Sequence, residues 1–480
     1  MIVLLGALLS GAMFYLSQGI DNVWWFAWFA PAPLLWLAYG ETPKWRLFAA
    51  ALAAFAAGQI YMLQCYGMDL LGTSIAMMLG EGALFGAIML YSRRIWRTLP
   101  TAASLLGFPA LWTAAEYAIG LVSPHGSYGS IAYSQVSFPA ALQTAPLLGM
   151  YAITFLLCLF ANALALLARS RLEAGAAGLA ACALAVVYGV FQLAAPQTTG
   201  MKVAALADWG ARQHAARRLD RAATLAMTRE YAAAARAQAD RGARLIAIPE
   251  GAIAADLQWL VPALAPLADV ARERRVTIVI GTILVKPWRN TAQALLPDGR
   301  ILAYDKRHLL LPGEARFKPG RSSGLLGRGR AVAICKDMDF PRTLRNDALA
   351  GEGQNGIRVM AVPASDFVRD GWIHARMAIL RGVENGFAIV RSAFKGMETI
   401  SDAEGRVIAS ADTNQPGLTV ISATVEPGGG ATLYTAIGDV FAWICLAVSV
   451  LLGALAARSS FLPPRGEAAG GGRWTLRENA

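Results

Sequence analysis

Long apolar runs dominate the first two hundred residues of the sequence. Seven such runs precede residue 200, and an eighth follows residue 435. The hydrocarbon core of a bilayer is about 30 Å thick, so a helix needs about 20 consecutive apolar residues to span it. The chain is also 56% hydrophobic and only 16% charged, unlike a typical soluble protein. We therefore expect an α-helical membrane bundle with spans at approximately 1–18, 23–39, 47–66, 71–91, 101–120, 143–168, 174–195 and 436–457.

Lysine and arginine are distributed unevenly among the short loops between these spans. The loops after the second, fourth and sixth spans carry them, and the intervening loops carry none; the basic residues are Lys44, Arg46, Arg93, Arg94, Arg97, Arg169 and Arg171. Basic loops stay in the cytoplasm. We expect both termini in the cytoplasm and residues 200–435 on the other side of the membrane, which in a Gram-negative bacterium is the periplasm. The first run has no basic segment before it, so we interpret it as a retained helix and not as a signal peptide.

The residues between the seventh and eighth spans have a different pattern. Short apolar runs alternate there with polar segments rich in alanine and arginine, which predicts buried strands at 201–208, 244–251, 276–284, 330–337, 357–365 and 387–394. Helices are expected at 211–242, 257–275 and 371–386, and hairpins at 291–308 and 401–410. Strands alternating with helices indicate an α/β sandwich. The predicted organisation is 1–199 membrane helices, 200–435 extracytoplasmic α/β domain, 436–457 membrane helix and 458–480 disordered cytoplasmic tail.

Three ends of predicted strands or hairpins carry reactive side chains. They are Glu250 in IAIPEGA, Lys306 in AYDKRHLLLPGE and Cys335 in VAICKDMDF. Each alone has an ordinary interpretation, as a helix-capping acid, a surface charge and a packed core thiol. Together, a carboxylate base, an ammonium and a thiol form the set needed for acyl transfer through a thioester. Cys335 is also the only cysteine outside the predicted spans, which suggests reactivity in an oxidising compartment.

Other sequence features favour different functions less strongly. The four histidines are too dispersed to indicate a metal site, and no cofactor is expected. Basic residues are scattered, so attraction to lipid headgroups is expected and nucleic-acid binding is not. The segment Gly320 to Gly324 fits the G-x-S-x-G pattern but lacks a preceding strand, so we interpret it as a loop. Glu81 and Glu116 lie within apolar spans; for Glu116, packing and a role at a substrate entrance both stay open.

The order IPEGA, YDKRHLLLPGE, AICKD resembles the Glu–Lys–Cys triad of the carbon–nitrogen hydrolase (nitrilase) superfamily, whose fold is an α-β-β-α sandwich. With spans on both sides, the whole chain resembles the apolipoprotein N-acyltransferases, the integral-membrane branch, and blocks such as ILRGVENGFAIVRSAF and TLYTAIGD match that family. The resemblance implies transfer of an acyl chain from a phospholipid to the diacylglyceryl-cysteine of an apolipoprotein. It assigns the general base to Glu250, the oxyanion-stabilising cation to Lys306 and the nucleophile to Cys335. It also places a supporting glutamate at Glu314.

Some residues depart from the pattern of this family. An aromatic residue and a glutamate usually follow the cysteine, where this chain has Lys336 and Asp337. Asp337 keeps the charge with a shorter reach, so we count it as a supporting residue. The segment ARFKPGR after Glu314 is closer to soluble carbon–nitrogen hydrolases, and Ile119 replaces an arginine. These departures favour, as an alternative, a membrane-tethered amidase or a transferase with another amine acceptor. A further alternative, a binding or scaffold protein without catalysis, is opposed by the intact set of Glu250, Lys306 and Cys335.

Overall fold

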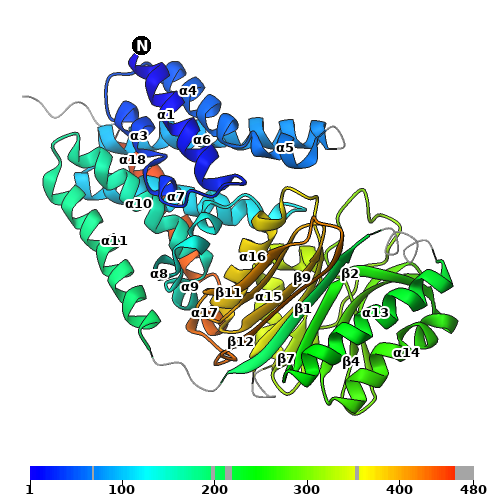
Figure 1. Ribbon diagram of the computed structural model, residues 1–480. Coiled ribbons are helices and arrows are strands. Elements are labelled where there is room, and N and C mark those ends of the chain that lie inside the picture. Colours follow the sequence, from blue (N-terminus) through cyan, green and yellow to red (C-terminus); the bar gives the residue numbers. More distant parts are fainter. Residues whose placement is uncertain (68–69, 196–199, 211–218, 352–355, 460–480) are drawn as a thin grey trace, which may run out of the picture.

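The computed structural model describes residues 1–67, 70–195, 200–210, 219–351, 356–459 of the chain. An α-helical part and an α/β part lie side by side (Figure 1). Of the predicted cytoplasmic tail, residues 460–480 lie outside the described residues, as do 211–218 at the start of a predicted helix.

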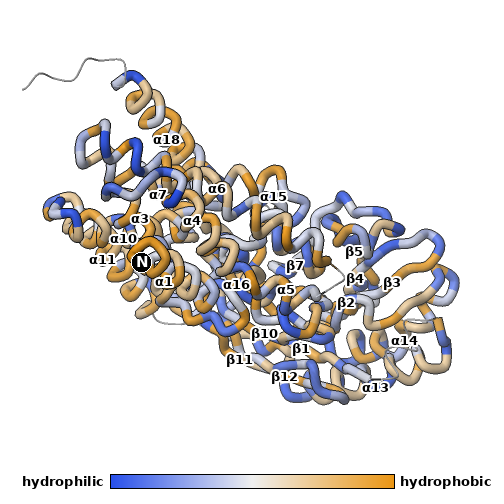
Figure 2. The backbone as a smooth tube through the Cα atoms, turned by 90° about the horizontal axis from the view of Figure 1, so that it is seen from above, coloured by the Kyte–Doolittle hydropathy of each residue, from blue (hydrophilic) through white to orange (hydrophobic). Residues whose placement is uncertain are grey.

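The helical part contains six helices that are long and apolar enough to cross a membrane, among the described residues. They are α4 with α5 (Lys44–Gly58 and Tyr61–Tyr66), α6 (Leu71–Thr98), α7 (Thr101–Val122), α10 (Met150–Leu167), α11 (Leu172–Leu193) and α18 (Val440–Arg458). These helices consist largely of hydrophobic residues (Figure 2). Large apolar side chains on them are exposed, such as Leu184, Phe191 and Val450. Outward apolar side chains are what a lipid-facing surface requires, so the chain is a multi-pass membrane protein.

The predicted number of eight spans is not confirmed. The first predicted span is α1 (Ile2–Gln18), which is 17 residues long, and the second is divided into α2 (Phe26–Phe29) and α3 (Ala32–Ala38). Pro31 and Pro33 lie at the start of α3. Proline lacks a backbone N–H and is favoured in the first turn of a helix, where that N–H has no partner within the helix, so the two prolines start a new helix here.

Shorter helices connect the spans and join the helical part to the α/β part. They are η1 (Ile131–Ser137), α8 (Pro139–Leu142), α9 (Ala145–Leu148) and α17 (Leu433–Ile437). Glu116 of α7 accepts hydrogen bonds from the Trp112 indole at 2.9 Å and from the hydroxyls of Ser130 and Thr154 at 2.7 Å each. These bonds satisfy a half-buried carboxyl group, and they support the packing alternative for Glu116.

The α/β part is a four-layer α-β-β-α sandwich, as predicted. One sheet has the order β12-β1-β2-β3-β4-β5, and the other has the order β11-β10-β9-β8-β7-β6. The first consists of β1 (Met201–Trp209), β2 (Leu245–Asp256), β3 (Thr277–Val285), β4 (Arg289–Leu295), β5 (Ile301–Asp305) and β12 (Gly417–Val425). The second consists of β6 (Leu325–Gly327), β7 (Arg330–Val332), β8 (Val359–Ser365), β9 (Ala388–Phe394), β10 (Met397–Ser401) and β11 (Val407–Asp412).

Alternating side chains of the strands build the layers. On β1, Val203 packs between the sheets, whereas Ala204 packs against the outer helices α13 (Arg221–Asp240) and α14 (Leu257–Glu273). The outer face of the second sheet packs against α15 (Pro341–Gly351) and α16 (Gly371–Asn385). The period-two alternation of a strand therefore fills both the middle and the outer core. The two predicted hairpins are β4–β5 and β10–β11.

Helix α16 fixes the sandwich to the helical part. The buried Arg376 guanidinium donates to the main-chain oxygens of Gln18 and Gly19 at 3.2 and 3.1 Å, at the C-terminal end of α1. The Glu384 carboxylate accepts a hydrogen bond from the Met150 backbone N–H at 2.7 Å, at the start of α10. Buried charged contacts of this kind are costly to break. They hold the membrane helices in a fixed position beside the sandwich.

Candidate active site

Glu250 is presented by an irregularity in β2. The pairing of β2 with β3 shifts between Ile248 and Ile253, because Pro249 lacks an N–H for the ladder and Gly251 has a φ of +56°. Opposite this bulge, a Cβ atom at Gly281 would lie 2.4 Å from the Cα of Glu250, so only glycine fits there. The bulge turns the Glu250 side chain into a cavity between the sandwich and the membrane helices.

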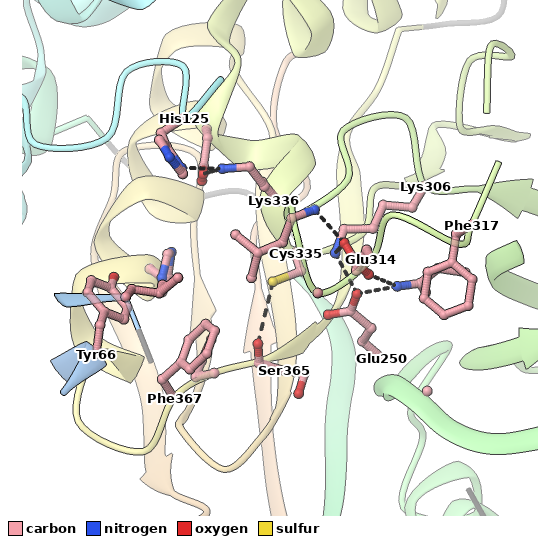
Figure 3. Close-up of a pocket in the computed structure, with 18 of the residues that line it drawn as sticks. Tyr66, His125, Glu250, Lys306, Glu314, Phe317, Cys335, Lys336, Ser365 and Phe367 are labelled. Carbon is pink, nitrogen blue, oxygen red and sulfur yellow. Dashed lines mark hydrogen bonds and ion pairs between the residues drawn. The ribbon is translucent and has the colours of Figure 1, made fainter. Parts of the chain in front are cut away.

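Lys306 directly follows β5 and lies between two carboxylates (Figure 3). Its ammonium is 2.7 Å from Glu250 Oε1 and 2.8 Å from Glu314 Oε2. The Asn290 side-chain amide joins the same two acids, because its Nδ2 donates to Glu250 Oε1 and Glu314 Oε1 at 2.6 Å each. The Leu310 backbone N–H also donates to Glu314 Oε2. The buried carboxylate of Glu250 and the half-buried one of Glu314 are thus held close together by one cation and one amide.

The electrostatics of this group keep Lys306 charged. Burial by itself lowers the pKa of the ammonium, but the negative charge of Glu250, together with that of Glu314, raises this pKa further than burial lowers it. The net pKa of Lys306 therefore lies above its usual value. A cation that stays charged in a buried site can stabilise an oxyanion without losing its proton.

Cys335 begins the short helix η2 (Cys335–Asp339) and lines the same cavity. Its φ of +42° is unusual for a residue other than glycine, and such strained positions cluster at functional sites. The thiol is oriented toward the main-chain oxygen of Ser365 at 3.7 Å. Burial, and then the negative charge of Glu250, raises the pKa of the Cys335 thiol well above its usual value. The resting thiol is therefore protonated and requires a base.

Asp337 does not line the cavity. Its Oδ2 accepts hydrogen bonds from the Tyr304 hydroxyl at 2.7 Å and the Ile334 N–H at 3.1 Å, and its Oδ1 accepts from the N–H groups of Arg307 and His308. One fully buried carboxylate thus connects the segment after Lys306 with the segment that carries Cys335. This geometry gives Asp337 a positioning role for the two loops.

The cavity has a volume of about 760 Å³ and two kinds of wall. Met62, Tyr66, Leu70 and Met77 come from α5, α6 and the connection between them, and they form an apolar wall opposite the reactive residues. A cavity at the junction of membrane helices and a sandwich suits a substrate that has an acyl chain and a polar group, because apolar surface binds the chain.

Sequence reasoning did not identify Asn290 and His125 as parts of this site. His125 lies in the loop after α7, and its Nδ1 is 3.2 Å from Lys336 Nζ, which is also 3.2 Å from Asp339 Oδ2. The sequence around an asparagine at the start of a strand does not indicate a catalytic site. The same holds for a histidine that lies 211 positions from its partner in the chain. The segment Gly320 to Gly324 is a loop before β6, as predicted. In the described part of the chain, no group of three or more His, Cys, Asp or Glu side chains could hold a metal ion.

Known proteins match both parts of the chain. The family model described as apolipoprotein N-acyltransferase N-terminal domain matches residues 10–163, and the carbon–nitrogen hydrolase model matches residues 208–432. A relative from Geobacter metallireducens, named apolipoprotein N-acyltransferase, is 26% identical, over 94% of this chain and 95% of the relative. One of the same name from Vibrio vulnificus is 24% identical, over 93% and 96%. Among solved structures, a double mutant of the amidase from Nesterenkonia sp. AN1 in complex with acrylamide is 21% identical, with a TM-score of 0.38, over 48% of this chain and 92% of the amidase.

Proposed function

We propose that this chain, which belongs to the apolipoprotein N-acyltransferase family, transfers an acyl chain from a phospholipid to the α-amino group of a diacylglyceryl-cysteine at the N-terminus of an apolipoprotein. The observation that carries the proposal is the convergence of Glu250, Lys306 and Cys335 on a cavity that has membrane helices as its opposite wall. A soluble amidase needs no such wall, whereas a lipid donor does.

In the first step, Glu250 accepts the proton of the Cys335 thiol as the sulfur attacks the ester carbonyl of the lipid. Lys306 is the cation of the set, and it stabilises the oxyanion together with backbone N–H groups, for which the N–H after Cys335 is a candidate. When the ester C–O bond breaks, Glu250 returns the proton to the leaving oxygen of the lysophospholipid. The acyl chain is then a thioester on Cys335.

In the second step, the neutral α-amino group of the acceptor attacks the thioester carbonyl. Glu250 removes the N–H proton and passes it to the departing Cys335 sulfur, so an amide forms and the thiol is restored. Glu314 supports this cycle by bonding to Lys306, and Asp337 supports it by fixing the two loops. Neither step consumes a cofactor.

Transfer and hydrolysis differ in what discharges the thioester. We expect acyl-Cys335 to persist when purified protein is mixed with phospholipid alone, and to be discharged rapidly when a diacylglyceryl-cysteine peptide is added, because a bound amine has a high effective concentration and the apolar wall of the cavity disfavours attack by water. Mass spectrometry of both enzyme and peptide measures this. Release of free fatty acid without acceptor, and no N-acyl peptide with it, would establish the membrane-tethered amidase instead. No acyl adduct under any condition would favour the scaffold alternative.

We also propose that the chain lies in a bacterial inner membrane with the sandwich on the periplasmic side. The support is the concentration of Lys and Arg in alternate loops, such as Arg93 and Arg97 at the end of α6 and Arg169 after α10. A phosphatase reporter that is active only outside the cytoplasm should be active when fused after residue 200 and inactive when fused after residue 459. The reverse pattern would contradict this orientation.

A further inference from the structure

Arg316 lies at the cavity that contains Cys335, yet the proposed cycle does not use it. Its guanidinium carbon is 4.3 Å from the ring centre of Trp288 and 5.3 Å from that of Phe317, and all three residues line the cavity. Arg316 itself is exposed. Among the described residues, no carboxylate pairs with it and none accepts a hydrogen bond from it. The site therefore has a cation with free donors beside its cavity.

The turn that carries Arg316 is fixed to the catalytic strands. The Lys318 N–H donates to the Trp288 main-chain oxygen at 3.1 Å, and the Gly320 N–H donates to that of Lys306 at 2.8 Å. The Phe317 N–H also donates to the main-chain oxygen of Glu314 at 2.9 Å. Since two residues of extended chain span about 7 Å at most, the Cα of Arg316 cannot lie further than this from that of Glu314, whose carboxylate contacts Lys306. The backbone of Arg316 is thus held near the catalytic group, and its side chain lines the same cavity as Cys335.

The chemistry of this guanidinium favours a phosphate oxygen as its ligand. Its carbon lies over the Trp288 ring, a contact that uses no hydrogen-bond donor, so its N–H groups are left for a ligand. Those donors form a fork that matches two phosphate oxygens. The nearby acid Glu314 does not neutralise this charge, because both of its oxygens already accept hydrogen bonds from Lys306, Asn290 and Leu310. A cationic amine acceptor would be repelled by Arg316, whereas an anionic phosphodiester would be attracted.

We propose that Arg316 binds the phosphodiester of the donor phospholipid and so places the neighbouring acyl ester at Cys335. This inference rests on the function proposed above and adds to it the group by which the donor is recognised. Arg316 is a binding residue for the first step only, since the lysophospholipid that carries the phosphate leaves before the acceptor reacts. The segment ARFKPGR, a departure from the family pattern, then acts on the donor and not on the acceptor.

The test compares two acyl donors in micelles of a nonionic detergent, which present no charged surface. One donor is phosphatidylglycerol; the other is a p-nitrophenyl ester of a fatty acid, which has no phosphate. The second-order rate constant for acylation of Cys335 is measured by mass spectrometry for the wild-type chain and three variants. Arg316→Gln removes the charge, Arg316→Lys keeps the charge without the fork, and Arg321→Gln is the matched control. Arg321 is exposed on the same segment but is not among the residues that line the cavity.

We expect Arg316→Gln to lower the rate constant with phosphatidylglycerol about tenfold or more, because charge-assisted hydrogen bonds to phosphate are lost. The rate with the p-nitrophenyl ester should not change, Arg316→Lys should be intermediate, and Arg321→Gln should match the wild type with both donors. An equal loss with both donors, no loss with either, or an equal loss in Arg321→Gln would each overturn the proposal. If the wild-type chain forms no acyl-enzyme from phospholipid at all, the proposed function itself fails, and this inference fails with it.

Discussion

Replacing Cys335 by alanine is expected to abolish both the acyl-enzyme and the N-acyl product, with a loss of at least about 10³-fold in transfer rate. The reason is that no second thiol can replace it. The other cysteines are buried in membrane helices: Cys65, Cys158, Cys182 and Cys445. Of the five cysteines, only Cys335 lines the cavity. Incubation with phospholipid, followed by mass spectrometry of the intact protein, should show the added acyl mass in the wild type and none in the variant.

Cys65→Ala is the matched control for this experiment. Cys65 lies in α5, whose residues Met62 and Tyr66 line the cavity. The side chain of Cys65 does not line the cavity and is buried among apolar residues. The adduct should form in this variant as in the wild type and should be released by hydroxylamine, which cleaves thioesters. An adduct that survives in Cys335→Ala would remove Cys335 from the mechanism.

The sandwich could be predicted closely from the sequence because its central strands are buried on both faces. Such strands form continuous apolar runs with no competing helical period. The runs at 276–284, 357–365 and 387–394 became β3, β8 and β9 with shifts of at most a few residues at their ends. Glu250, Lys306 and Cys335 each lie at the end of a predicted strand or hairpin. Such ends can meet at one edge of a sandwich, so the sequence also indicated that the three residues share a site.

Two features of the fold depend on tertiary contacts and had no local signal. The apolar run at 330–337 continues through Cys335, but β7 ends at Val332 and the chain turns into η2. The strain at Cys335 is held by neighbouring contacts, including those of Asp337 with Ile334 and His308. Similarly, Asn290 reaches Glu250 only because a bulge in β2 lies beside β3 and β4. Hydrogen-bond partners of this kind are set by register between strands, which a single sequence does not specify.

Glu250→Gln is expected to slow acylation by about 10² to 10⁴, because the thiol loses its general base. The substitution preserves the shape of the site, since Lys306 and Asn290 both donate to the single atom Glu250 Oε1, which a glutamine oxygen can replace. Glu273→Gln is the matched control: Glu273 pairs with Arg236 on the surface of the sandwich, so the same change of charge there should leave the rate unaltered. Thermal unfolding of each variant checks that the fold is intact.

The pH dependence distinguishes loss of a base from general damage to the site. Without Glu250, attack requires the thiolate of Cys335, whose fraction rises about tenfold per pH unit below the thiol pKa. Burial holds this pKa above its usual value, so residual acylation by Glu250→Gln should keep rising from neutral into mildly alkaline solution. The acylation rate of Lys306→Met should not rise with pH in this way. This variant lacks the positive charge that lowers the pKa of the Cys335 thiol and stabilises the oxyanion. It also leaves Glu250 and Glu314 without the cation that both contact. Rates from stopped-flow acylation between about pH 6 and 9 measure both profiles. A flat profile in Glu250→Gln, parallel to that of Lys306→Met, would show that Glu250 holds the site together and is not the base.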